Sequence, residues 1–102
     1  MNINQPAFFP QPGATVSIAA TSSSGNVQVQ PGNRSRHIRV YNAGSVTVFL
    51  EFSDNNAVAA STTTSYPLPP GAVEIISAPL EYMAAITATG TATVYATPGE
   101  GL

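Results

Sequence analysis

The chain has 102 residues and a formal net charge of −2, and charged residues make up only 8% of it, against roughly 25% in an average soluble domain. Broad nucleic-acid binding is disfavoured, since it depends on lysine and arginine and this chain has three arginines and no lysine. The absence of cysteine excludes disulfides, thiol catalysis and thiolate metal sites. The length predicts a single domain. A surface with so few charges repels neighbouring molecules only weakly. The composition is therefore typical of a subunit that is packed against other subunits.

Targeting and membrane segments are not evident in the sequence. The N-terminal segment lacks the basic region and apolar run of a secretory signal. No apolar stretch approaches the roughly 20 residues that span a bilayer. We therefore expect a soluble protein with no membrane partner and no export.

The first twelve residues, MNINQPAFFPQP, place Pro6, Pro10 and Pro12 around Phe8 and Phe9. This composition predicts an extended arm at residues 1–12. Two adjacent phenylalanines cannot be hidden locally, so we expect the arm to dock on its own domain or on a neighbouring subunit. The domain itself is predicted at residues 13–98, followed by a short flexible tail at residues 99–102.

Strand signals dominate the domain, as short β-branched runs with period-two alternation separated by Gly, Pro, Asn and Ser. The predicted strands are Ala14–Ala20, Asn26–Gln30, Arg36–Tyr41, Val46–Ser53, Thr63–Pro67, Ala72–Ser77, Tyr82–Ala88 and Ala92–Thr97. Seven or eight short strands predict an all-β fold, a single antiparallel β-sandwich of Ig-like or jelly-roll type, with a small barrel as the alternative. The pattern leaves the order of the strands open.

Two hairpins are predicted within this sandwich. The first joins residues 36–41 to 46–53 through a loop with an odd number of residues, for example Asn42–Gly44 with Gly44 as the left-handed residue. The second joins residues 82–88 to 92–97 through Thr89–Thr91. The side chains that these hairpins are expected to turn toward the core are Ile38, Val40, Val46, Val48, Leu50, Phe52, Ala84, Ile86, Ala88, Ala92, Val94 and Ala96.

The positive charges are all concentrated in the segment NRSRHIR, residues 33–39. If Ile38 and Val40 face the core, then His37, Arg39 and Tyr41 face outward beside Phe49 and Glu51 of the partner strand. Arg, Tyr and Phe are enriched in the cores of protein interfaces. A solvated strand face and an anion site remain alternatives. The candidate protein-interface residues are Phe8, Phe9, Arg34, Arg36, His37, Arg39, Tyr41 and Phe49.

Catalytic and metal chemistry find little support in the sequence. His37 is the only histidine, with Ser35 beside it and Glu51 or Asp54 as possible acids, but no strand-to-helix elbow exposes a nucleophile. The run Asp54–Asn56 lacks the glycine and bidentate glutamate of a calcium loop and is typical of a polar turn. One histidine without cysteine does not make a zinc site. We predict that the protein is not an enzyme and has no cofactor and no metal.

Three segments carry a resemblance to a known class of proteins. They are MNINQPAFFPQPGATVSIAAT, HIRVYNAGSVTVFLEFSD and YPLPPGAVEIISAPLEYMAAITATGTATVYATPGEGL. In their style and order they resemble small virion proteins of tailed bacteriophages, particularly the accessory head proteins that decorate or cement capsids. The likeness covers most of the chain and lies in the order of segments rather than in one motif.

This resemblance implies a non-catalytic β-sandwich that binds and stabilises the outer surface of a capsid shell, as an oligomer. Its partners would be the major capsid protein or other virion subunits, and it would be assembled into the virion in the host cytoplasm. Two alternatives stay open. One is a head–tail connector or a tail or fibre component, and the other is a β-sandwich that binds carbohydrate or a host surface. The absence of tryptophan disfavours the sugar-binding alternative.

Overall fold

The computed structural model describes residues 7–30, 35–77 and 80–101, and in these ranges the chain forms strands, turns and loops and no helix. The strands are β1 (Phe9–Pro10), β2 (Val16–Ala20), β3 (Gly25–Gln28), β4 (His37–Asn42), β5 (Val48–Ser53), β6 (Tyr66–Leu68), β7 (Val73–Ile76), β8 (Tyr82–Thr87) and β9 (Ala92–Glu100). The last eight correspond to the eight predicted strands, and β1 lies in the predicted arm. The all-β prediction is confirmed.

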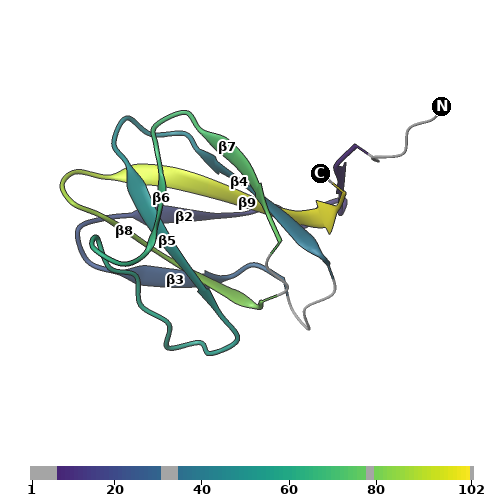
Figure 1. The fold of residues 1–102 in the computed structure, drawn as a ribbon, viewed down its shortest axis with the longest axis horizontal. Helices are drawn as coiled ribbons and strands as arrows, with labels where there is room; N and C mark the ends of the chain where they lie inside the picture. Colours follow the sequence, from purple (N-terminus) through teal and green to yellow (C-terminus); the bar gives the residue numbers. More distant parts are fainter. Residues whose placement is uncertain (1–6, 31–34, 78–79, 102) are drawn as a thin grey trace.

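The strands form two antiparallel sheets packed face to face (Figure 1). Sheet A has the order β7, β4, β9, and the other edge of β9 pairs first with β2, at residues 92–96, and then with β1, at residues 99–100. Sheet B has the order β3, β8, β5, β6. This arrangement confirms the predicted antiparallel β-sandwich.

The pairing also shows which kind of sandwich it is. Strand β2 pairs with β9, β3 with β8, β4 with β7 and β5 with β6, as in one long hairpin of eight strands. Rolling up that hairpin brings β9 beside β4 in sheet A and β8 beside β5 in sheet B. This is the strand arrangement of a jelly roll. Of the two sandwich types that the sequence left open, the chain adopts this one.

Both predicted hairpins are wrong, because β4 and β5 lie in different sheets, and so do β8 and β9. In a sandwich, strands of both sheets alternate between inward apolar and outward residues. The alternation therefore does not distinguish two consecutive strands that form a hairpin from two that lie in different sheets. Gly44 does not have the predicted left-handed conformation. Glycine is instead required at this position because the backbone packs closely there. A Cβ on Gly44 would lie 2.7 Å from the Ala92 Cα, where the chain crosses from β8 to β9.

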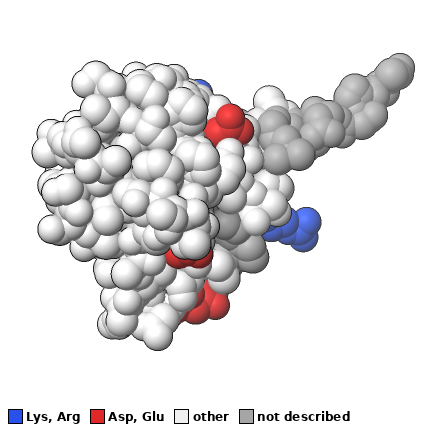
Figure 2. All heavy atoms as spheres, turned by 60° about the vertical axis from the view of Figure 1, so that its left-hand side comes forward, with Lys and Arg blue, Asp and Glu red and all other residues white. Residues whose placement is uncertain are grey.

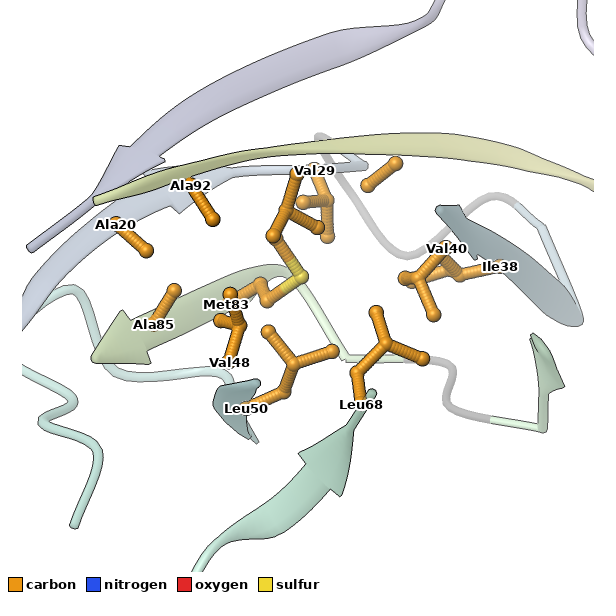
Figure 3. Packing of buried hydrophobic residues seen from close by; sticks show 12 residues of the cluster. Ala20, Val29, Ile38, Val40, Val48, Leu50, Leu68, Met83, Ala85 and Ala92 are labelled. Carbon is orange, nitrogen blue, oxygen red and sulfur yellow. The ribbon is translucent and has the colours of Figure 1, made fainter. Parts of the chain in front are cut away.

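The core lies between the sheets and is filled from both sides (Figure 3). Ile38 and Val40 of sheet A point toward Leu50 and Leu68 of sheet B, and each of the four is almost fully buried. Burying such a side chain contributes about 1.5–3 kcal/mol. At the other end of the core lie the small side chains of Ala20, Ala85 and Ala92.

The inward face of β8 differs from the prediction. Met83 and Ala85 belong to the core cluster, whereas Ala84 and Ile86 face outward, and Ala88 is exposed. Both faces of YMAAIT are apolar, so the alternation was ambiguous there. The predicted core positions on β4, β5 and β9 do pack in the core or against it.

Strand β1, near the N-terminal end of the described residues, pairs with the last residues of β9. Strand β9 continues to Glu100, three residues beyond its predicted end at Thr97, so Gly99 and Glu100 of the predicted tail segment lie in a strand and Pro98-Gly99 lies inside it. Phe9 pairs with Glu100, and a Cβ on Gly99 would lie 2.6 Å from the Phe8 ring. The arm therefore docks on its own domain at Phe8–Pro10, while residues 1–6 lie outside the described ranges.

Candidate functional site

The outer face of sheet B is covered by the chain itself. The loop between β5 and β6, residues 54–65, folds over it, and Ala84 has no exposed surface although it points away from the core. The loop is attached by hydrogen bonds from Asn26 Nδ2 to the carbonyl oxygens of Asn56 and Val58 (both 3.2 Å), from Ala60 N to Ser24 Oγ (2.8 Å) and from Ser65 Oγ to Glu51 Oε1 (2.8 Å). The middle of this face, at Ala84, is thus buried, and Phe49 and Ile86 beside it are half-buried.

The outer face of sheet A carries exposed aromatic side chains. In the register of the sheet, Tyr41 of β4 stands opposite Tyr95 of β9 on one side and Val73 of β7 on the other. These three residues are 41–42% exposed. The two tyrosine rings stack with their centroids 6.3 Å apart and their planes at 17°.

A shallow hollow of about 250 Å³ lies on this surface, between those residues and the next row of the sheet. Arg39 and Thr97 complete its lining and stand opposite each other in the register. We call these five residues, Arg39, Tyr41, Val73, Tyr95 and Thr97, the tyrosine face.

Arg39 is the one charged residue of the tyrosine face. It is exposed, and within the described ranges its guanidinium has no ion-pair partner. The wider surface is poor in charge, and Figure 2 shows only a few charged groups among uncharged atoms on the side that it presents. Exposed tyrosines around one unpaired arginine have the composition of an interface core. The surface is therefore suited to binding another molecule.

The structure brings together only part of the predicted interface. Arg39 and Tyr41 are adjacent on one face, as expected. Phe49 is not beside them, because β5 belongs to sheet B, and its half-buried ring is on the opposite outer face. The aromatic partner of Tyr41 is Tyr95, which the sequence analysis missed. The alternation around Val94 indicates that Tyr95 points outward. It does not indicate that Tyr95 lies beside Tyr41 of β4.

The remaining predicted residues gather where β1 meets the end of β9. Phe8 is half-buried, whereas Phe9 is 73% exposed. His37 Nδ1 accepts a hydrogen bond from Gly101 N (3.2 Å), and the exposed Arg36 donates its backbone N–H to Glu100 Oε2 (3.3 Å). Arg34 lies outside the described ranges. This end of the molecule is thus a second surface, separate from the tyrosine face.

The groups considered for catalysis are not assembled. Ser35 is buried and donates its hydroxyl to Gln11 Oε1 (3.2 Å), whereas Glu51 lies on β5 of sheet B and accepts from Ser65 Oγ (2.8 Å). Asp54 accepts from the backbone N–H of Glu81 (3.0 Å). In residues 7–30, 35–77 and 80–101 no three metal-ligating side chains come together, and no helix there could cross a membrane. The described residues bring together no arrangement that suggests a reaction.

Comparison with known proteins adds no relative. The chain matches no protein-family model, and no curated protein and no solved structure is significantly similar to it.

Proposed function

We propose that this protein is a non-catalytic structural component of a tailed-bacteriophage virion, which binds and stabilises the capsid shell through protein–protein contacts. The observation that carries the proposal is the tyrosine face. Tyr41, Tyr95 and Val73 are all exposed on a sheet face that the described part of the chain leaves uncovered. An apolar patch of this kind on a small protein marks a binding surface.

Two further features support this role. Jelly rolls occur in viral capsid domains and in lectins, so the fold is compatible with a virion part. The chain also carries only 8% charged residues, which suits a protein that spends its life packed in an assembly. A connector or tail position would use the same kind of surface and belongs to the same proposal.

A second candidate is carbohydrate binding, favoured by the exposed rings of Tyr41 and Tyr95 beside the hollow. Tyrosine rings can stack on sugars while polar neighbours bind the hydroxyls. The polar groups at this hollow are few, however. Thr97 Oγ1 is already hydrogen bonded to Thr15 Oγ1 (2.8 Å), which leaves the guanidinium of Arg39 and the two tyrosine hydroxyls. We therefore rank protein contact first.

The test has two steps: the reading frames beside this gene are searched for a major capsid protein, and binding is then measured on capsid shells assembled from that protein. Wild-type protein should sediment with the shells and saturate, and the double variant Tyr41→Ser/Tyr95→Ser should lose most of that binding. Tyr66→Ser is the matched control, because Tyr66 is 46% exposed but lies on β6 of sheet B. Failure of the wild-type protein to bind shells, together with saturable binding on a glycan array, would replace this proposal with the second candidate.

A further inference from the structure

We propose that the hollow of the tyrosine face receives Phe9 of a second copy of this chain, so that copies associate head to tail. This inference rests on the proposed function in one respect, since it takes the tyrosine face as a protein-contact surface. It adds that a neighbouring copy fills the hollow, so that the tyrosine face supports shell binding by linking copies that the shell holds side by side, and it names the residues that each copy contributes.

The inserting group is Phe9, the most exposed large apolar side chain among the described residues, at 73%. It lies on β1, which extends together with the end of β9 beyond the body of the sandwich (Figure 1). Pro10 follows it directly, and proline-rich segments commonly dock in aromatic-lined grooves. A phenylalanine side chain can bury about 150–250 Å² in such a contact.

The receiving group is the hollow itself. Its volume of about 250 Å³ suits one aromatic side chain, and two tyrosines, Tyr41 and Tyr95, line it together with Val73. Aromatic rings prefer to pack against one another in offset or edge-to-face geometry. The hollow thus offers Phe9 an aromatic surface that no described residue of the same chain occupies.

Phe9 cannot reach the hollow of its own chain. Pairing holds it opposite Glu100, and the nearest residue of β9 that lines the hollow, Thr97, lies three residues earlier. At about 3.3 Å per residue these positions are roughly 10 Å apart, and because side chains alternate along a strand, Glu100 and its partner Phe9 point away from the face that carries Thr97 and Tyr95. Only another copy can bring a Phe9 to this hollow.

Charge complementarity sets the orientation of the contact. Glu100 is the strand partner of Phe9, so its exposed carboxylate accompanies the inserting ring. Arg39 lies at the rim of the hollow without an ion-pair partner in the described part of the chain. Insertion therefore brings Glu100 of one copy to Arg39 of the next. Such pairs contribute mainly to the specificity and speed of association.

The inserting and receiving surfaces lie on different parts of the molecule, so the contact is heterologous and generates a ring or an open chain of copies. One aromatic side chain in a shallow hollow buries much less than the roughly 1,200 Å² of a stable complex. We therefore expect weak self-association in solution, which becomes strong when copies are held close together on a larger surface.

The experiment is analytical ultracentrifugation of the full-length protein over a wide concentration range at low salt, without shells. Wild-type protein should show reversible association, which Phe9→Ser and Tyr95→Ser should each weaken by about tenfold or more. Tyr66→Ser should associate like the wild type, and circular dichroism should show that every variant is folded. An equimolar mixture of Phe9→Ser and Tyr95→Ser should form one-to-one dimers and nothing larger, because one variant keeps the hollow and the other keeps Phe9.

Charge reversal gives an independent readout. Arg39→Glu and Glu100→Arg should each weaken association, and the double variant Arg39→Glu/Glu100→Arg should restore it. Wild-type protein that stays monomeric at millimolar concentration would overturn the inference, as would a Phe9→Ser variant that associates normally. Shell binding is measured separately. Shells bound through the tyrosine face by a protein that does not self-associate would refute this inference alone, whereas self-association without shell binding would refute only the proposed function.

Discussion

The outer faces of the two sheets contain similar residues but differ in how far these residues are buried. On sheet B, the loop of residues 54–65 folds over Ala84, which is fully buried, and Phe49 and Ile86 beside it are half-buried. On sheet A, Tyr41 and Tyr95 are more than 40% exposed. The composition of a strand therefore does not determine whether its outward side chains are buried or exposed. That depends on whether a connection is long enough to fold back over it.

This contrast separates stability from binding. Residues under the covering loop contribute to the free energy of folding, since their burial is intramolecular. Residues of the tyrosine face gain little from folding and have apolar surface left to bury against another molecule. Substitutions on sheet B should thus lower stability, and those on sheet A should mainly change association.

The largest expected loss of stability comes from a substitution where the chain crosses between the two sheets. Gly44→Ala places a Cβ 2.7 Å from the Ala92 Cα, where the two crossings between the sheets pack together. We expect a loss of about 2–3 kcal/mol in the free energy of unfolding, because overpacking forces the backbone apart. Gly25→Ala is the control, since its Cβ would meet only Ile18 Cδ1 at 3.9 Å. Equal urea midpoints for the two variants would contradict the close-packed crossing.

The next effect tests whether the loop covers sheet B. Ala84→Leu should displace the loop and destabilise the protein by about 1–3 kcal/mol, as expected of overpacking at a buried site. Ala19→Leu makes the same change on the exposed outer face of sheet A and should shift stability by less than about 0.5 kcal/mol. Thermal unfolding measures both. A neutral Ala84→Leu would mean that the loop leaves this face open in solution.

A smaller effect concerns the attachment of the loop. Ser65 Oγ donates to Glu51 Oε1 (2.8 Å) and accepts from the backbone N–H of Ser61 (2.9 Å). Ser65→Ala removes both hydrogen bonds and should cost about 1–2 kcal/mol, with faster proteolysis between residues 54 and 65. Ser17→Ala, on the exposed outer face of sheet A, serves as the control. Unchanged proteolysis in the Ser65 variant would show that other contacts hold the loop.

The smallest effect on stability should come from the tyrosine face. A double-mutant cycle with Tyr41→Ser and Tyr95→Ser should give a coupling energy of about 0.5–1 kcal/mol, typical of a cross-strand aromatic pair. The same variants should strongly reduce association. If the coupling exceeded about 2 kcal/mol, the pair would be a structural element of the monomer and the contrast between the faces would weaken.

The sequence by itself determined the class of fold and most of the core. The eight predicted strands are all present, and the alternation around Ile38, Val40, Leu50 and Val94 correctly marked their buried sides. These features are local, since a strand with one buried face must alternate whatever its neighbours are.

Only the tertiary structure decided which strands lie side by side. Alternation reports that a side chain points inward or outward, but not which sheet contains its strand, so Tyr41 seemed to belong with Phe49 rather than Tyr95. Pairs such as β2 with β9 are also far apart in the sequence, and the geometry of the whole roll determines them. The exposure of Tyr41 and Tyr95 and the burial of Ala84 depend on that geometry, because they are decided by what packs over each face.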